Sequence, residues 1–499
     1  MSIGKSSRSV VANAKVLDNA VALHQGGSHD EALELYRDIL TTDPTNSVAL
    51  VYGGVALLET GQVVEAISQL EAAVELHPNM ADIHGYLANA LQLANRPEAA
   101  ERHYHRATDL EPGDPTLHGN FGAFLMKQDR LQEAMERFYR AIILKPNYGP
   151  AFNNLCECLR RQGKTIEAVE AGEQAINIDP ESAEAHENLG GALIEAQRVE
   201  DAIAAYRRAV EIGSNPIDAL NNLSIALIIG RQLDDALTIT GRCLDSDAGN
   251  IQAIATQSIA LQELGDSDGV EALLDYNLLT RETTIDVPSG YETLADFNEA
   301  LADHVRTHPT LVEAPDGNAT RAGMHSGDLL AEPAGPFRAF EAVIRDEVSA
   351  YLKSIPQGVN HPFFAKYPAQ YALDVWGIVL TGEGHQIPHI HPSGWLSGCY
   401  YPKVPPDITP DDPGCRGWFE FGRPQPLYDA QATPNVREIC PRESLLLLFP
   451  SFIFHRTIPS ETTEERISIA FDVRPIGYCS SGSITTFASG GKEDPIRQG

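Results

Sequence analysis

The chain is organised around the stretch Gly384-His-Gln-Ile-Pro-His-Ile-His-Pro-Ser-Gly-Trp-Leu-Ser-Gly-Cys-Tyr-Tyr401. Three histidines lie within seven residues of it, and His389 and His391 are separated by a single residue. Residues i and i+2 of an extended segment point to the same side, so these two imidazoles can approach one metal ion. Prolines flank the pair, and a residue before proline avoids the helical conformation. We therefore expect an extended segment here, with His385 as an ordinary surface or core residue.

Two residues farther along the chain extend this set. His455 follows the apolar run 445–449, and Arg466 opens a strand-like segment eleven residues later. Imidazole binds iron, zinc, nickel and copper alike, so the ligand type alone does not select the metal. Arginine is a fixed cation whose guanidinium group can bind a carboxylate through two hydrogen bonds. The order of these residues suggests an iron site with an anion-binding arginine beside it.

Six motifs follow one another between residues 376 and 473. They are His389-x-His391, Ser397-Gly-x-Tyr-Tyr401, Gly417-x-x-x-Phe421, Leu448-Phe-Pro450, His455 and Arg466-x-Ser468. Together they resemble the Fe(II)/2-oxoglutarate-dependent oxygenases, and most of all a bacterial group that carries HxHP followed by SGxYY. The resemblance implies a double-stranded β-helix, which is a relative of the jelly-roll and cupin folds. It also implies an enzyme, a hydroxylase that uses Fe(II), 2-oxoglutarate and O2.

The resemblance places the metal on histidines, with one departure from the usual pattern. The superfamily commonly binds iron through two histidines and a carboxylate, and here His391 stands where the carboxylate normally stands. Either His389, His391 and His455 all bind iron, which we favour, or His391 does not and water takes the third position. A two-histidine version is known in the aspartyl/asparaginyl β-hydroxylases, which also join helical repeats to an oxygenase. The nearest acid in the sequence, Glu383, lies on the wrong side of the pair.

The resemblance also places the co-substrate. The far carboxylate of 2-oxoglutarate is expected on Arg466, which makes Arg466 both a catalytic and a co-substrate-binding candidate. Ser468 shares a strand face with Arg466 and is expected to add a hydrogen bond. Tyr401 and its neighbour Tyr400 are further candidates for the same end of the pocket.

Residues of three kinds recur every 34 positions in the first half of the chain. This period indicates tetratricopeptide repeats, in which small residues let paired helices approach closely and proline stops the second helix. We expect about eight repeats over residues 14–276. The recurring residues are the prolines Pro44, Pro78, Pro112, Pro146 and Pro180, the alanines Ala32, Ala66, Ala100, Ala134, Ala168, Ala202 and Ala236, and a series of small residues from Ala20 to Ser258.

Asparagine recurs at the same period, at Asn120, Asn154, Asn188 and Asn222. In such arrays the first helix of each repeat lines the concave groove. A side-chain amide offers an acceptor and two donors, so it can pair with the backbone of an extended peptide. The series resembles the asparagine ladder of O-linked N-acetylglucosamine transferase and predicts a peptide-binding groove. The alternative is a polar, solvated helix face that repeat duplication preserved.

The remaining chain is expected to hold the catalytic half. We predict a helical connector and outer elements over 277–370, a β-helix core over 371–480 and a loose tail over 481–499. Helical patterns lie near 293–307 and 335–355, where they would cover the outside of the core. The fold prediction is thus an all-α tetratricopeptide superhelix followed by an α+β double-stranded β-helix domain.

Composition limits the partners. The 499 residues carry a net charge of −32, which argues against nucleic acid, since Lys and Arg must neutralise phosphates, and against anionic membranes. No apolar run reaches the ~18 residues of a membrane span, and the first ten residues lack the apolar core of a signal peptide. Seven scattered cysteines favour reduced thiols in a cytoplasm. The oligomeric state is not indicated.

These observations favour an oxygenase that hydroxylates a protein or peptide docked in the repeat groove. Docking would raise the effective concentration of the substrate at the iron. Two alternatives stay open. One is an oxygenase for a small molecule, with the repeats as a partner scaffold. The other is a catalytically inert metal-binding scaffold, which only the missing carboxylate favours.

Overall fold

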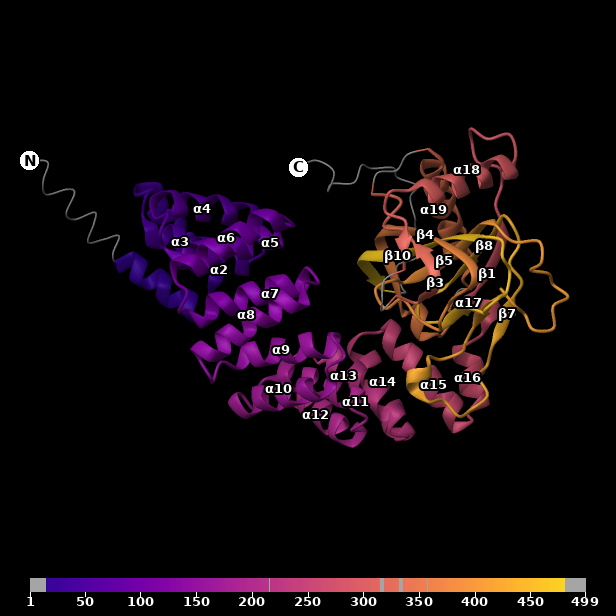
Figure 1. Cartoon of the computed structure of the whole chain (residues 1–499), viewed down its shortest axis with the longest axis horizontal. Helices are drawn as coiled ribbons and strands as arrows, with labels where there is room; N and C mark the ends of the chain where they lie inside the picture. Colours follow the sequence, from indigo (N-terminus) through magenta and orange to yellow (C-terminus); the bar gives the residue numbers. More distant parts are fainter. Residues whose placement is uncertain (1–14, 215, 315–317, 332–334, 357, 481–499) are drawn as a thin grey trace, which may run out of the picture. The chain divides into compact units, whose positions relative to one another are not determined.

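The computed structural model describes residues 15–214, 216–314, 318–331, 335–356 and 358–480, whose course is shown in Figure 1. The tail expected over 481–499 lies outside these residues. The chain divides into two compact units, residues 1–212 and 213–499. The described part of the first unit is helical, and the second combines helices with two antiparallel sheets.

The first unit is a series of helix pairs with the predicted 34-residue period. In five pairs the second helix ends two residues before a proline of the series, as α4 does at Leu76 before Pro78. A helix over 15–25 is followed by α2 (His29–Thr42), α3 (Ser47–Glu59), α4 (Val63–Leu76), α5 (Ala81–Leu93), α6 (Pro97–Leu110), α7 (Pro115–Lys127), α8 (Leu131–Leu144), α9 (Gly149–Arg161), α10 (Thr165–Ile178), α11 (Ala183–Glu195) and α12 (Val199–Ile212).

The small residues let these helices approach closely, as expected. The recurring alanines, such as Ala100 and Ala134, are fully buried. A Cβ atom added at Gly122 would lie 2.6 Å from Cε1 of Phe138, and one added at Gly190 would lie 2.7 Å from the ring of Tyr206. Each aromatic ring therefore fills the space that a side chain on the partner helix would need. The predicted helical repeat superhelix is confirmed.

The second unit begins with helices and ends with strands. Its helices are α13 (Ile217–Ile229), α14 (Leu233–Ser246), α15 (Ile251–Leu264), α16 (Ser267–Leu273), α17 (Tyr276–Leu279), α18 (Leu294–Thr307) and α19 (Pro336–Ser354), with short 3-10 turns η1 (Pro362–Ala365) and η2 (Pro426–Tyr428). Its strands are β1 (Arg281–Thr284), β2 (Val312–Glu313), β3 (Thr320–His325), β4 (Lys366–Gln386), β5 (Leu396–Lys403), β6 (Phe419–Phe421), β7 (Arg437–Ile439), β8 (Leu445–Pro450), β9 (His455–Thr457) and β10 (Arg466–Ser480).

The strands form two antiparallel sheets. The larger has the order β1-β8-β5-β10-β4-β3-β2, and the smaller has the order β7-β6-β9. Rings of β6 contact Phe449 of β8, with 5.6 Å between the centroids of Phe419 and Phe449. Because these rings join the sheets, the small sheet covers one face of the large sheet. The result is an antiparallel β domain, consistent with the predicted jelly-roll-like oxygenase fold.

Helices α18 and α19 cover the other face of the large sheet, close to the ranges in which helices were expected. Phe340 of α19 packs against Tyr400 of β5, with ring centroids 5.1 Å apart. The connector also supplies strands that were not predicted, since β1 and β3 both join the large sheet. These strands are short and pair with residues more than fifty positions away.

The compact units divide at residues 212 and 213, inside the repeat array rather than near residue 276. The reason is that the last helices are bonded to loops of the β domain. The Glu263 carboxylate of α15 accepts a hydrogen bond from the Ala432 amide at 2.8 Å. The Tyr276 hydroxyl donates to the Asn435 carbonyl at 2.6 Å. Within the described residues, no helix combines the length and apolar character that a bilayer crossing requires.

Candidate functional site

The structure brings His389, His391 and His455 together on the face of the large sheet that the small sheet covers. His389 lies on an extended segment, and its backbone forms two 3.0 Å hydrogen bonds with the backbone of His455, the first residue of β9. The ring centroids are 4.2 Å apart for His389 and His455, and 5.0 Å for His391 and His455. One ligand nitrogen from each ring lies within 4.8 Å of the other two. The three imidazoles can therefore share one metal ion.

The other nitrogen of each ring is already engaged. In all three histidines Nδ1 lies at hydrogen-bond distance from an oxygen that can only accept, so Nδ1 carries the proton and Nε2 keeps its lone pair. Metal-binding histidines are held in this way by carbonyl or carboxylate groups. The acceptors are the Ile387 carbonyl for His389 at 2.8 Å, the Ile453 carbonyl for His455 at 3.0 Å and the Asp472 carboxylate for His391 at 2.7 Å.

Asp472 of β10 is a site residue that the sequence reasoning missed. Its carboxylate accepts a hydrogen bond from Nδ1 of His391 and a 2.6 Å hydrogen bond from the hydroxyl of Ser397. Ser397 in turn lies 2.8 Å from the hydroxyl of Ser451. The residue could have been found from strand alternation, because Asp472 follows Arg466 by six positions and so shares its face. The orientation of His391 is thus fixed by a polar network of its own, independently of His389.

Burial also sets the protonation of the histidines. It lowers the pKa of His389 to about 3, with a further contribution from the neighbouring His391. The pKa of His455 is held well below its usual value, first by burial and then by His389. A metal binds only the neutral imidazole, and these two rings are neutral at physiological pH. They need not lose a proton before binding a metal.

Arg466 lies deeply buried on the same sheet face, with 3 % of its surface exposed. Its guanidinium group donates to the Gly417 carbonyl at 2.5 Å and to the Tyr401 hydroxyl at 3.3 Å. Its Nε has no hydrogen-bond partner, and no ion pair joins it to a carboxylate among the described residues. A buried cation without a counter-ion is costly unless an anion compensates it. The site therefore suits a ligand with a carboxylate group.

The remaining co-substrate candidates differ in position. Ser468 is buried on the same strand face as Arg466, and Tyr401 lies beneath the guanidinium, 5.0 Å from its carbon to the ring centroid. Burial raises the pKa of Tyr401 well above its usual value, so its hydroxyl is neutral. Tyr400 points to the opposite face, where its hydroxyl donates to Asn298 of α18 at 2.6 Å. Tyr400 is therefore not brought to the site, because adjacent residues of a strand face opposite sides.

Aromatic rings surround the histidines. Phe419 stacks on His455 with centroids 5.6 Å apart, and Phe449 meets the same imidazole at 4.8 Å. Trp376 of β4 stacks on His391 at 5.5 Å. By contrast, Trp395 is a core residue that stacks on Phe363. The rings near the histidines restrict the access of water.

The four asparagines of the repeat series are half-buried on the first helices of their repeats. Asn188 of α11 donates a 2.8 Å hydrogen bond to the side chain of Asn153, which is itself buried. Asn188 therefore has one donor fewer for a ligand. Asn120, Asn154 and Asn188 belong to the first compact unit, and Asn222 belongs to the second.

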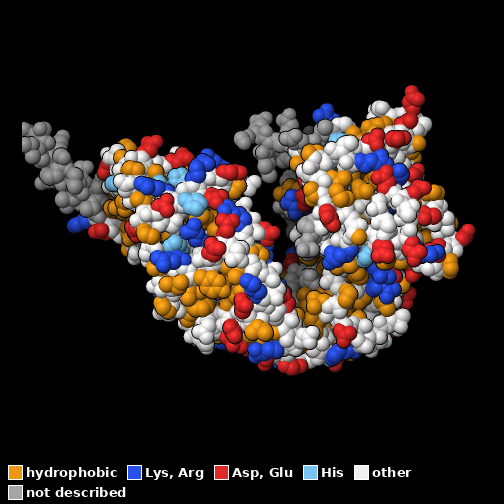
Figure 2. Space-filling view, in the orientation of Figure 1, with side chains coloured by type: hydrophobic (Ala, Val, Ile, Leu, Met, Phe, Trp, Pro, Cys, Tyr) orange, Lys and Arg blue, Asp and Glu red, His pale blue; other side chains and the backbone are white. Residues whose placement is uncertain are grey.

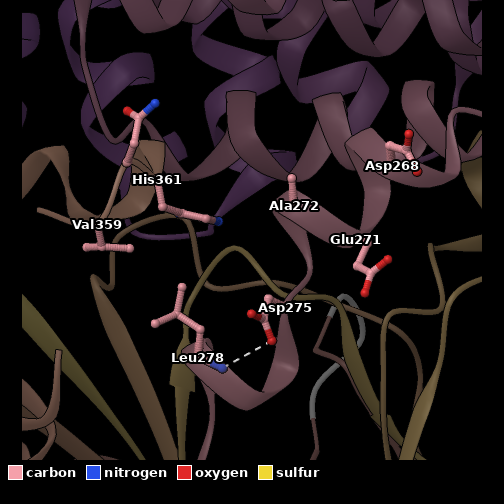
Figure 3. A pocket seen from close by; sticks show the side chains of 8 residues that line it. Asp268, Glu271, Ala272, Asp275, Leu278, Val359 and His361 are labelled. Carbon is pink, nitrogen blue, oxygen red and sulfur yellow. Dashed lines mark hydrogen bonds between the residues drawn. The ribbon is translucent and has the colours of Figure 1, made fainter. Parts of the chain in front are cut away.

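A separate cavity of about 390 Å³ lies beside α16 and α17 (Figure 3). Its acidic side chains do not converge on one point. The Asp275 carboxylate accepts a 3.2 Å hydrogen bond from the Leu278 amide. The His361 ring forms a 3.1 Å hydrogen bond with the Leu273 carbonyl. None of the three site histidines lines this cavity. Its lining residues are Asp268, Glu271, Ala272, Asp275, Leu278, Val359, Asn360 and His361.

Known protein families match both halves of the chain. Residues 374–472 match a family model described as "Putative 2OG-Fe(II) oxygenase". Residues 57–120 and 158–216 each match a model of the tetratricopeptide repeat. The chain thus joins tetratricopeptide repeats to a domain of this oxygenase family, as its motifs predicted. No curated protein matches the sequence.

Solved structures similar to this chain include two with low sequence identity. A structure of pilF from Pseudomonas aeruginosa is 22 % identical with a TM-score of 0.39, and the match covers 42 % of this chain and 96 % of that one. The APC/C hetero-tetramer Cut9-Hcn1 is 18 % identical with a TM-score of 0.44, and the match covers 48 % of each chain.

Proposed function

We propose that this tetratricopeptide-repeat oxygenase hydroxylates a protein or peptide segment. The observation that carries the proposal is the buried, uncompensated guanidinium of Arg466 on the same sheet face as three convergent imidazoles. Bound Fe(II) and 2-oxoglutarate would supply the oxidative chemistry, in which O2 converts a substrate C–H bond to C–OH while 2-oxoglutarate becomes succinate and CO2. We keep the cytoplasm as the expected compartment, because Cys156, Cys158, Cys243, Cys399, Cys415 and Cys440 are free thiols.

The residues present suit both groups. His389, His391 and His455 would hold Fe(II) through their Nε2 atoms, since each Nδ1 is engaged elsewhere. Arg466 would bind the far carboxylate of 2-oxoglutarate, which gives its Nε a partner. Ser468 and Tyr401 would hold the same carboxylate.

We favour three histidine ligands over two. The carboxylate of Asp472 holds the proton of His391 at Nδ1 and orients the ring, which raises the basicity of Nε2 as a ligand. A histidine outside the metal shell would not need this support. In most family members a carboxylate ligand brings a negative charge to the metal. Here that charge would lie behind His391, on Asp472.

The substrate is proposed to be an extended segment of a protein. Asn120, Asn154 and Asn222 carry half-buried amides at one repeat position, and each can pair with a peptide backbone. Recognition through the backbone makes few demands on sequence. The chemical choice of the modified residue would then lie with the aromatic rings around the histidines, including Trp376.

The test combines co-substrate turnover with product detection. The purified full chain would be incubated with Fe(II), 2-oxoglutarate and cell lysate, while succinate and peptides 16 Da heavier are followed. We expect lysate-dependent succinate and oxidised peptides, both absent from a His455→Ala control. Succinate stimulated only by the small-molecule fraction of the lysate would favour the small-molecule enzyme. No succinate above the control would favour the scaffold protein.

A further inference from the structure

A second cluster of metal-ligand side chains lies at the beginning of the described repeats, in the first compact unit. His24 is near the end of the helix over 15–25, His29 is the first residue of α2, and Glu59 is the last residue of α3. One oxygen of Glu59 lies 2.7 Å from Nε2 of His24 and 2.8 Å from Nδ1 of His29. The ligand atoms of all three residues lie within 4.8 Å of one another.

Hydrogen bonding accounts for only one contact of this cluster, between Nε2 of His24 and Glu59. Nδ1 of His29 lies close to the Glu59 oxygen but lacks a hydrogen-bond partner of suitable geometry, and Nδ1 of His24 is also buried without one. The hydroxyl of Tyr36, whose side chain is fully buried next to His24, is a third such atom. Buried polar atoms without a partner are rare in native proteins and call for a bound ion or water. Two of them belong to histidines that converge on the Glu59 carboxylate, which points to a cation-binding site.

Other histidines of the array are bonded differently, although Nδ1 of His118 is also buried without a hydrogen-bond partner. His118 bonds the Pro112 carbonyl at 3.1 Å, and His186 bonds the Pro180 carbonyl at 3.0 Å, so both support the turn that precedes their own helix. Histidine side chains lie on the visible face of the N-terminal unit in Figure 2. An exposed histidine is therefore not unusual here, and the convergence on Glu59 is what distinguishes the cluster.

We propose that His24, His29 and Glu59 form a second metal site, which binds a divalent transition metal such as Zn²⁺. Two imidazoles and one carboxylate are a common protein ligand set for zinc, with water in the remaining position. Ligands of one tetrahedral zinc ion lie roughly 3.4 Å apart, so Glu59 must move away from the two nitrogens by about 0.6–0.7 Å. Its side chain is 42 % exposed and free to do so.

The site would serve the fold and not the oxidation chemistry. It would join three consecutive helices, the first and third of which already share the His24–Glu59 hydrogen bond. It lies in a different compact unit from His389, His391 and His455. The inference is therefore independent of the proposed function, and it holds whether or not the oxygenase domain is active.

The test counts zinc on the full chain after treatment with a chelator and dialysis against Zn²⁺. The variants His29→Ala and Glu59→Gln should each carry about one equivalent less than wild type, with the affinity of this site lowered at least about tenfold. The matched control is His105→Ala, because His105 is an exposed histidine of α6 that also faces a carboxylate, at 3.8 Å. It should keep the wild-type zinc content.

Amide hydrogen exchange supplies a local readout that the oxygenase site does not affect. Zinc should slow exchange within residues 15–59 of wild type and of His105→Ala, but not in Glu59→Gln. Glu59→Gln preserves the size of the side chain, so loss of protection there cannot be assigned to unfolding once the circular dichroism spectra agree. Equal zinc content and equal protection in wild type, His29→Ala and Glu59→Gln would overturn the proposal.

Discussion

The repeats and the β domain build their interiors from contacts of very different sequence span. In the repeats, Gly122 meets Phe138 on the next helix, sixteen positions away. In the β domain, Asp472 holds His391 across 81 positions, and Asn298 holds Tyr400 across 102. A change in one repeat can therefore stay local, whereas a change of strand register would separate the whole candidate site. The following experiments test that difference, from the largest expected effect to the smallest.

His455→Ala should abolish succinate formation and metal binding at the candidate site. The imidazole is buried between His389 and Phe419, so its removal takes away both a ligand and the packing of its neighbours. The helical signal of the repeats in circular dichroism should stay unchanged. Loss of that helical signal as well would contradict the independence of the two regions.

Replacing Asn120, Asn154 and Asn222 together by Ala should weaken peptide binding by roughly 1.5–4.5 kcal/mol, if each amide contributes about 0.5–1.5 kcal/mol. Asn188 is left intact, because its removal would deprive the buried Asn153 of a donor. Peptide affinity and succinate formation without substrate are both measured. Only the affinity should fall. Unchanged peptide affinity would show that the recurring asparagines form only a polar, solvated helix face.

Arg466→Ala should raise the 2-oxoglutarate requirement about ten- to a hundredfold, since a hydrogen bond to a charged group contributes roughly 1.5–3 kcal/mol. Iron content should stay near that of wild type. Arg466→Lys serves as the control, because it keeps the charge but loses the planar guanidinium group. Its 2-oxoglutarate requirement should lie between those of wild type and Arg466→Ala. An unaltered requirement in the alanine variant would assign Arg466 to structure alone.

Asp472→Asn should weaken metal binding about 10- to 100-fold, which is the usual effect of losing a partner behind a histidine ligand. An amide is a weaker acceptor for the Nδ1 proton of His391 than a carboxylate. Metal content is measured beside that of His391→Ala. If both variants keep full metal content, the site has only two histidine ligands.

Gly122→Ala should destabilise the repeats modestly and leave succinate formation unchanged. The added Cβ would overpack against the fully buried Phe138, at a cost of about 1–3 kcal/mol that exceeds the helix propensity gain of about 0.5–1 kcal/mol. Thermal melting is compared with that of Gly113→Ala, where an added Cβ meets nothing within 4 Å. A lowered turnover would show coupling between the regions.

More of the structure of the repeats than of the β domain can be predicted from the sequence. A 34-residue period reports contacts between neighbouring helices, so Pro78 and Ala100 were enough to predict where the helices of a pair end and meet. In the β domain, chain order identified His389, His455 and Arg466, because motif order survives without a register. Strand alternation puts Asp472 on the same face as Arg466, but its pairing with His391 follows only from knowing that β10 lies beside Ser397.

Residues whose role depends on distant partners were the ones missed or misplaced. Tyr400 and Tyr401 are adjacent in sequence, and only the pairing of β5 with β10 decides which of them faces Arg466. His24, His29 and Glu59 come from three helices and follow no period. Nothing in the sequence marks them as neighbours.

The bonds between α15 and the loops of the β domain have an evolutionary consequence. Repeats that precede residue 213 can be duplicated or lost by recombination at the 34-residue period without altering the β domain. The helices after residue 213 cannot be exchanged in this way, because Gln262, Glu263 and Tyr276 are bonded to particular loop residues. Descendants of this gene should therefore vary in the number of early repeats and keep the last ones fixed.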